Sequence, residues 1–353
     1  MSERASYFDK LEDKGLITSA PRFIRNNIHY EVIMGSFAYG VTSDTSDMDV
    51  YGFCIPPRDM IFPHLRGEIQ GFGRQKTNKF EQFQQHHILD KSSQKEYDIT
   101  IYNIIKYFQL CMENNPNMID SLFVPVRCIT HSTQIGNLLR ENRRLFLHKG
   151  SWHKFKGYAF SQLKKCKNKI AKEWVDFCLS EDVDYNFTKQ QFIDEGNRRK
   201  EPREGYYFIE GIRILNILEQ SGDRTTRLDS IAKFGYDVKF AYHIVRLLNE
   251  VEQILIEHDL DLERNREQLK AIRRGEWPLE KIEEYFNFKE KSLEELYTSS
   301  TLPHSPDEQR IKNILLQCLE IHYGSLDNCI KKDKSMEMLI NDLEEVLNKY
   351  KEN

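Results

Sequence analysis

Two aspartates separated by one residue, Asp47 and Asp49, lie in the segment DMDVYG. In an extended strand alternate side chains share one face, so both carboxylates point the same way while Met48 and Val50 point to the other. Two carboxylates this close repel each other unless a cation lies between them, and their oxygens are hard ligands suited to Mg²⁺. The alternative is a strand end with two solvated aspartates, and this short pattern alone does not decide between the two.

A glycine and a serine, Gly35 and Ser36, precede this pair at the end of an apolar run. Glycine lets a phosphate group approach the backbone closely, and the serine hydroxyl and nearby N–H groups can hydrogen-bond to phosphate oxygens. A turn and a small polar loop then return the chain to the aspartates. The combination favours a site in which a triphosphate lies on the Gly-Ser turn beside the two carboxylates.

The elements that must position these residues differ between the two halves of the chain. Strand-like runs cover 31–36, 47–55 and 97–104, and the polar segment 71–90 has the composition of a loop or an edge strand. From residue 130 onward apolar residues recur three and four apart, which predicts helices, while the polar stretch 180–205 predicts a loop. We therefore expect a catalytic domain of strands and helices over residues 1–130 and an all-α domain over residues 131–353.

The chain has the composition of an ordinary globular protein, with 30% charged and 39% hydrophobic residues and a net charge of −4. No apolar run approaches the roughly 18 residues of a membrane span, and the charged N-terminus lacks the apolar core of a signal peptide. The seven cysteines contain no CxxC pair, which favours reduced thiols over a zinc cluster. No GxGxxG or GxxxxGK[ST] motif is present, which argues against Rossmann and P-loop folds. We expect a cytoplasmic protein without a membrane partner.

The segment GSFAYGVTSDTSDMDVYG resembles the GS…DxD signature of the DNA-polymerase-β superfamily of nucleotidyltransferases. Further segments resemble the narrower RNA-repair-pathway polymerase-β family: EYDITIYNIIKYFQLCMENNPNMIDSLF, FKGYAFSQLKK, GYDVKFAYHIVRLLNEV and IRRGEW. The resemblance covers most of the chain, from about Tyr30 to Trp277. It implies an α+β fold, with a polymerase-β-like nucleotidyltransferase domain on a small mixed sheet, followed by an all-α domain.

The resemblance also implies roles for the carboxylates. Asp47 and Asp49 would hold two Mg²⁺ ions, with Mn²⁺ as the alternative metal, and a third carboxylate from a neighbouring strand would complete the second ion site. Asp98 is the candidate for this third carboxylate. It and Glu96 share the strand face opposite the core-facing Tyr97. Glu96 is the second choice.

The triphosphate, expected to be ATP, would lie on the Gly35–Ser36 turn and meet cations from the helical half. The candidates for these contacts are Lys154, Lys156, His243 and Arg246. For His243 and Arg246 the alternative is a solvated or buried, salt-bridged helix face. In the acid-free lysine run from Lys154 to Lys172, three residues recur four and three positions apart, namely Lys165, Lys169 and Lys172. They predict either an RNA-binding stripe or an ordinary solvated face.

The resemblance implies transfer of a nucleoside monophosphate from a triphosphate to an acceptor hydroxyl, first of all at an RNA end. Nucleotidylation of a protein or a small molecule is the second hypothesis, and an inactive nucleotide-binding relative is the third. The sequence leaves the base, the acceptor and the oligomeric state open. His86 and His87 have no cysteine or acidic partner at metal-ligand spacing, so we interpret them as loop or strand residues.

Overall fold

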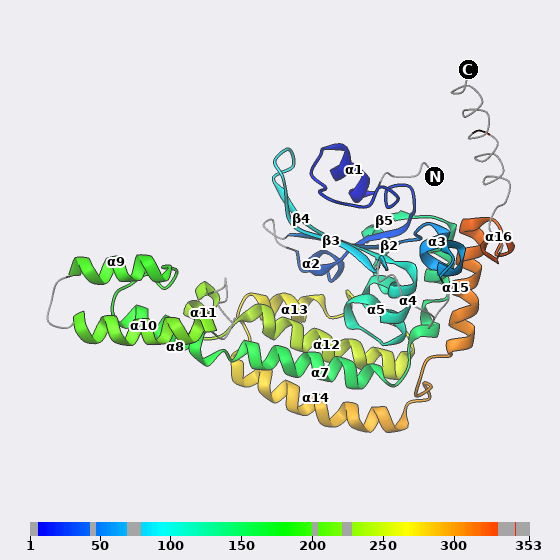
Figure 1. Cartoon of the computed structure of the whole chain (residues 1–353). Helices are drawn as coiled ribbons and strands as arrows, with labels where there is room; N and C mark the ends of the chain where they lie inside the picture. Colours follow the sequence, from blue (N-terminus) through cyan, green and yellow to red (C-terminus); the bar gives the residue numbers. More distant parts are fainter. Residues whose placement is uncertain are drawn as a thin grey trace, which may run out of the picture. The chain divides into compact units, whose positions relative to one another are not determined.

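A computed structural model describes residues 6–42, 47–68, 79–199, 204–220, 228–330 and 343. The chain divides into two compact units (Figure 1). The first unit combines residues 1–146 with 306–353, and the second comprises residues 147–305. These bounds differ from the predicted division at residue 130, because the first unit includes a C-terminal segment from far along the sequence. The functional domains 1–130 and 131–353 remain a prediction.

The first unit is built on a five-stranded mixed sheet with the strand order β3-β4-β2-β1-β5. Strands β2 and β4 are parallel neighbours, and the other neighbouring pairs are antiparallel. The strands are β1 (Ile28–Ile33), β2 (Met48–Cys54), β3 (Gln82–Asp90), β4 (Lys95–Asn103) and β5 (Ile129–Ser132). The small mixed sheet confirms the expected α+β class. Strand β5 was not expected, and it crosses the predicted boundary at residue 130.

Helices and short helical turns complete the first unit. The α-helices are α1 (Tyr7–Asp13), α2 (Gly35–Ala38), α3 (Arg58–Ile61), α4 (Ile104–Met112), α5 (Pro116–Phe123), α6 (Gln134–Glu141), α15 (Glu308–Tyr323) and α16 (Asp327–Ile330). The 3-10 turns cover Pro63–Arg66, Val126–Cys128 and Arg143–Phe146. Helix α15 contacts α4 and α6, and His322 near its end hydrogen-bonds through Nδ1 to Nε2 of His29 at 2.9 Å.

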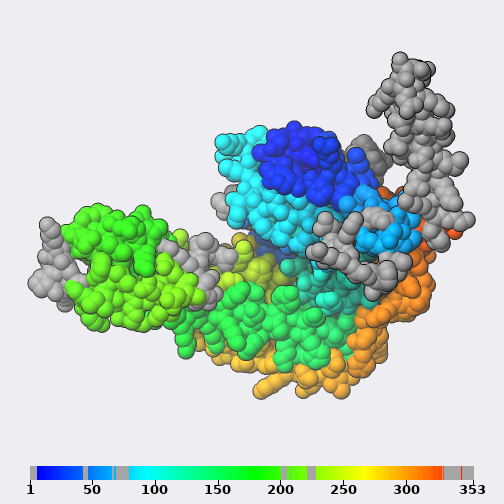
Figure 2. All heavy atoms as spheres, in the orientation of Figure 1, coloured from blue at the N-terminus to red at the C-terminus, as the bar shows by residue number. Residues whose placement is uncertain are grey.

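The two faces of the sheet have different surroundings because side chains alternate along each strand. Met48 and Val50 of β2 and Ile99 of β4 lie in an apolar cluster with Phe8 and Leu11 of helix α1. Helix α1 covers part of the unit's surface beside the strands (Figure 2). Because this face is buried, the register of β2 and β4 cannot slip by one residue without exposing the cluster. The polar residues between these positions are therefore held on the opposite face.

The buried carboxylate of Glu31, on β1, joins helix α1 to the sheet. Its two oxygens accept the backbone N–H groups of Tyr7 at 2.6 Å and Phe8 at 3.0 Å, at the start of α1. One of them also accepts the hydroxyl of Thr130 at 2.6 Å. Burial raises the pKa of Glu31, and the three donors oppose this change. The interaction satisfies the first N–H groups of the helix, which have no partner within it.

The second unit is entirely helical within its described residues. It contains α7 (Ser151–Cys166), α8 (Lys169–Ser180), α9 (Lys189–Arg199), α10 (Glu204–Gln220), α11 (Leu228–Phe234), α12 (Val238–Glu257), α13 (Arg266–Arg273) and α14 (Leu279–Ser299). Helix α12 packs against α7, α13 and α14. Helices α8 to α11 share a separate apolar cluster around Trp174 and Phe192. The loop predicted over 180–205 is wrong in part, because α9 lies within it and buries Phe192.

We predict that Glu31→Ala destabilises the first unit by roughly 3 kcal/mol, because buried N–H and O–H donors lose their acceptor. Amide hydrogen exchange in α1 and β1 measures this change. All three tryptophans, Trp152, Trp174 and Trp277, belong to the second unit, so their fluorescence should report an unaltered unfolding transition there. The exposed Glu141 provides the control variant Glu141→Ala. Unchanged exchange in α1 would contradict the anchoring role.

Candidate active site

Asp49 and Asp98 lie opposite each other on the parallel strands β2 and β4. Their Cα atoms are register partners, and Met48 pairs with Tyr97 one position earlier. Met48 and Tyr97 are buried on the α1 side, whereas Asp49 and Asp98 are half-buried on the other. Neighbouring strands are about 4.8 Å apart, so the two carboxylates leave adjacent backbone positions on one face. This register brings together two of the three predicted catalytic aspartates.

Asp47, the third predicted aspartate, lies exposed just before β2 begins. Its negative charge is among those that raise the pKa of His87, which places it near the same end of the sheet. Glu96 is half-buried two residues before Asp98 on the same face of β4. The sheet therefore gathers four carboxyl groups at one end, and the choice between Glu96 and Asp98 as the third metal ligand remains a prediction.

Gly35 lies directly against the carboxylate of Asp49. The residue has φ +63°, in the left-handed region, and an ideal Cβ placed on it would lie 2.1 Å from Oδ2 of Asp49. The backbone N–H of Met34 also donates to the carbonyl oxygen of Asp49 at 2.7 Å. From sequence we attributed this glycine to room for a phosphate. In the structure the space beside Gly35 already contains the Asp49 carboxylate, so the glycine is required for the turn and the aspartate to pack together.

A β-bulge in the edge strand β3 faces Asp98. In the register, Gln85 pairs with Ile99 and Ile88 pairs with Tyr97. Two residues of β3, His86 and His87, therefore lie opposite the single residue Asp98 of β4. His87 has φ +54°, an uncommon conformation for a residue with a side chain. The bulge releases the N–H of His87 from the ladder, and it donates instead to Oδ1 of Asp98 at 2.8 Å.

Both histidines of this bulge face carboxylates. Nδ1 of His86 lies 3.2 Å from Oδ2 of Asp98, and Nδ1 of His87 lies 2.5 Å from Oε1 of Glu96. The hydrogen bond to Glu96, together with the charges of Glu96, Asp98 and Asp47, raises the pKa of His87. Both histidines lie in strand β3, in agreement with their interpretation as loop or strand residues, and they also have acidic partners. Their partners come from the neighbouring strand, which no spacing along the chain reveals.

The carboxylate face changes from open to buried along β2. Asp49 is followed on this face by Tyr51 and then by the fully buried Phe53, whose ring packs against Tyr107 of α4 at 5.0 Å. Burial raises the pKa of Tyr51 well above its usual value, and the negative charges of Asp49 and Asp98 add to this effect. Helix α4 thus closes one end of the face, and the carboxylates lie at the end that solvent reaches.

A cation that sequence analysis missed lies beside the Gly-Ser turn. The exposed Arg127 donates from Nη2 to the carbonyl oxygen of Phe37 at 2.9 Å, and its guanidinium lies 5.0 Å from the centre of the Phe37 ring. Phe37 follows Ser36 directly in α2. Arg127 precedes β5, an element that was not expected, so its proximity to the turn could not be inferred from sequence.

The predicted cation contacts from the helical half belong to the second unit. Lys156 forms an ion pair with Glu290 at 2.7 Å and lies 5.0 Å from the ring of Trp152. Arg246 is buried and donates to both carboxylate oxygens of Glu250, at 3.0 and 3.2 Å. This pair matches the buried, salt-bridged alternative for the α12 face.

The other two predicted contacts lie on α7 and α12 of the same unit. Lys154 is exposed on α7, and the ring of His243 lies 4.4 Å from that of Tyr242. A role for Lys154, Lys156, His243 or Arg246 at the triphosphate remains a prediction.

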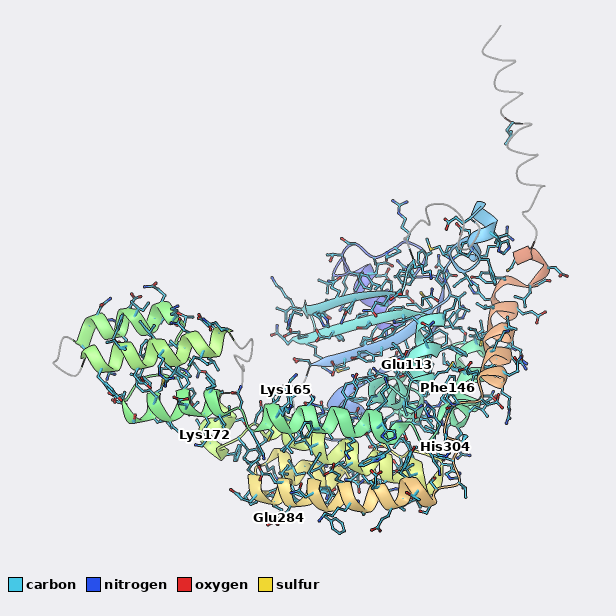
Figure 3. The ribbon with its side chains drawn as sticks, turned by 60° about the horizontal axis from the view of Figure 1, so that its bottom comes forward. Glu113, Phe146, Lys165, Lys172, Glu284 and His304 are labelled. Carbon is cyan, nitrogen blue, oxygen red and sulfur yellow. The ribbon has the colours of Figure 1, made fainter. Side chains whose placement is uncertain are left out.

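The lysine run does not form a single helical stripe. Helix α7 ends at Cys166 and α8 begins at Lys169, so Lys165 and Lys172 lie on different helices (Figure 3). Lys172 pairs with Asp176 at 2.9 Å, and Lys167 forms an ion pair with Glu283. Acidic residues outside the run thus neutralise part of its charge, which favours a solvated, paired face over an RNA groove.

The donor set around Asp98 fits a divalent cation. One ligand atom from each of His87, Glu96 and Asp98 lies within 4.8 Å of the other two. Asp49 adds an adjacent carboxylate that is turned toward Gly35. Carboxylate oxygens are hard ligands of the kind that Mg²⁺ and Mn²⁺ bind. Asp47, Asp49 and Asp98 are of the ligand type that such ions bind, and their role as metal ligands remains a prediction.

Among the described residues, no helix is long and apolar enough to cross a membrane. No curated protein and no solved structure is significantly similar to the chain. The model of one family matches residues 14–317, which include the sheet, the Gly-Ser turn, all four carboxylates and the whole helical unit. That family is described as the RNA repair pathway DNA polymerase beta family, and because the match spans well over half of the sequence, the chain belongs to it.

Proposed function

We propose that the protein transfers a nucleoside monophosphate from a nucleoside triphosphate, with ATP as the expected donor, to a hydroxyl at an RNA end. The observation that carries this proposal is the in-register pair Asp49 and Asp98 with the Gly35 turn packed against Asp49. Such an arrangement offers phosphate and metal contacts on one strand face. Membership of an RNA repair pathway polymerase-β family supports both the reaction class and the acceptor class.

Asp47, Asp49 and Asp98 would hold two divalent ions, expected to be Mg²⁺ with Mn²⁺ as the alternative metal. When bound, such ions stabilise the charge on the attacking and leaving oxygens of a displacement at phosphorus. Asp49 is directed toward the Gly35 turn and Asp98 toward the histidine bulge. We therefore assign Asp49 to the side of the triphosphate and Asp98 to the side of the acceptor hydroxyl, whose proton Asp98 would help to remove.

The turn at Gly35 and Ser36 would bind the triphosphate. Ser36 is half-buried and has a hydroxyl that can donate to a phosphate oxygen. Arg127, held against Phe37, supplies positive charge within the same unit. Lys154, Lys156, His243 and Arg246 are proposed as further phosphate contacts from the second unit. Of these, Lys156 and Arg246 would have to exchange an acidic partner for the phosphate.

The first prediction concerns the aspartates. Asp47→Asn, Asp49→Asn and Asp98→Asn should each fold normally and lower nucleotidyl transfer by several orders of magnitude, because each removes an anionic oxygen from at least one ion. The turnover of labelled triphosphate measures the effect. Asp176→Asn removes a carboxylate from an exposed ion pair with Lys172 and serves as the matched control. Near-normal turnover in any of the three variants would exclude that residue from the catalytic set.

The second prediction concerns the turn. Gly35→Ala should lower transfer about as strongly as Asp49→Asn, because even one methyl group displaces the Asp49 carboxylate. Gly67→Ala is the control for backbone strain, since Gly67 also has a left-handed φ, of +80°, but no atom lies within 4 Å of its ideal Cβ. Ser36→Ala should weaken the binding free energy of the triphosphate by only roughly 1–2 kcal/mol, as expected for one lost phosphate hydrogen bond. Equal, small effects of Gly35→Ala and Gly67→Ala would contradict this packing.

The third prediction concerns the acceptor. The unaltered protein is incubated with each of four α-labelled triphosphates and Mg²⁺, with and without tRNA. It should label the RNA, whereas the Asp98→Asn variant should transfer no label. Separation of RNA from protein on a denaturing gel identifies the acceptor. Label in protein alone would instead support nucleotidylation of a protein. Absence of label in every fraction would contradict the transferase assignment with these acceptors.

A further inference from the structure

The group around Asp98 contains a nitrogen donor as well as carboxylates. His87 Nδ1, a Glu96 oxygen and an Asp98 oxygen lie within 4.8 Å of one another, and the side chain of His87 is 84% exposed. Oxygen-only sites suit Mg²⁺, whereas imidazole nitrogen favours first-row transition ions. We propose that His87, Glu96 and Asp98 form a mixed nitrogen–oxygen site that selects a transition ion such as Mn²⁺ or Co²⁺ over Mg²⁺ on the Asp98 side of the active site.

The β-bulge places the His87 nitrogen next to two carboxylates. Two residues of β3 oppose the single residue Asp98, which turns His87 toward Glu96 on the same sheet face. His87 Nδ1 and Glu96 Oε1 form a short hydrogen bond of 2.5 Å, so an ion held by both atoms would replace the proton between them. A positive-φ histidine costs of the order of 1 kcal/mol. The fold retains this strained residue at the one place where the edge strand meets the carboxylates.

His86 has a different role, which is to orient Asp98. The side-chain amide nitrogen of Gln84 lies 2.6 Å from Nε2 of His86, and it can donate to that nitrogen when the ring proton is on Nδ1. That Nδ1 faces Oδ2 of Asp98 at 3.2 Å, while the backbone N–H of His87 donates to Oδ1. The backbone of His87 thus donates to one oxygen of Asp98, and the ring of His86 lies beside the other. Each oxygen keeps a further lone pair for an ion, as in other metal sites whose ligands are held by hydrogen bonds.

The metal site deepens the proposed function. Only the role of the ion in nucleotidyl transfer rests on that function. The ion near Asp98 would be the one on the acceptor side, so its identity would determine which metal supports transfer. Ion binding itself can be measured without nucleotide or acceptor. A failure of the metal proposal is therefore distinguishable from a failure of the transferase proposal.

The test compares ion affinities of the protein, two His87 variants and one control variant by calorimetry, with MgCl₂, MnCl₂ and CoCl₂ as separate probes. His87→Asn removes the imidazole but keeps a residue that tolerates positive φ, and His87→Gly keeps the bulge without any side chain. Both should lose roughly 10- to 100-fold in Mn²⁺ and Co²⁺ affinity. Their Mg²⁺ affinity should stay within about twofold, because Mg²⁺ binding rests on the carboxylates. His153→Gln, a histidine on α7 outside this group, should leave all three affinities unchanged.

Spectroscopy identifies the ligand directly. Electron spin echo spectra of Mn²⁺ bound to the unaltered protein should show coupling to an imidazole nitrogen, and His87→Asn should abolish it. Equal Mn²⁺ affinity in the variants, or absence of nitrogen coupling in the unaltered protein, would overturn the proposal. A parallel loss of Mg²⁺ and Mn²⁺ affinity would also overturn it, because His87 would then only shape the carboxylates.

Discussion

Asp49 and Asp98 carry like charges on adjacent positions of two parallel strands, and the surrounding elements are arranged around their mutual repulsion. The backbones of neighbouring strands are roughly 4.8 Å apart, so two carboxylates that leave adjacent positions on one face repel each other. The apolar cluster with α1 on the opposite face prevents a register slip that would separate them. The Gly35 turn packs against the carboxylate of Asp49, and the backbone N–H of His87 in the bulge donates a hydrogen bond to Asp98. Packing therefore keeps the carboxylates of Asp49 and Asp98 on adjacent positions in spite of their mutual repulsion.

Strand periodicity was the part of the site that sequence could predict. Asp49 and Asp98 alternate with buried neighbours, so their common orientation follows from a two-residue repeat. The reason for Gly35 could not be predicted, because its steric partner, Asp49, contacts it through tertiary packing. The histidines were missed for a similar reason. A bulge leaves no clear mark in the order of residues, and the acidic partners of His86 and His87 lie across the ladder on β4.

In the helical half, too, contacts between distant residues decided what the sequence pattern alone could not predict. The lysine run contains no acidic residue, yet Glu290 and Glu283 reach it from α14. The segment after Ser180 is polar on average, but α9 within it buries Phe192 and Gly196. That ring packs so closely on α10 that a Cβ on Gly211 would lie 2.1 Å from it. The mean polarity of a segment indicates how exposed it is to solvent. It does not show that one aromatic ring, such as that of Phe192, packs the segment as a helix against a neighbour.

The first unit is interrupted by the second, since residues 147–305 separate its sheet from α15. The second unit holds its own two ends together: the N–H of Lys149 donates to the carbonyl oxygen of Pro303 at 2.8 Å. Closing a flexible loop costs roughly 0.6 kcal/mol more with each doubling of its length. Once the inserted helices have folded, the sheet no longer bears the closure entropy of a long loop, because entry and exit already lie side by side. During synthesis the ribosome must nevertheless release the whole insert before α15 can dock, so the sheet unit is completed last although most of it is made first.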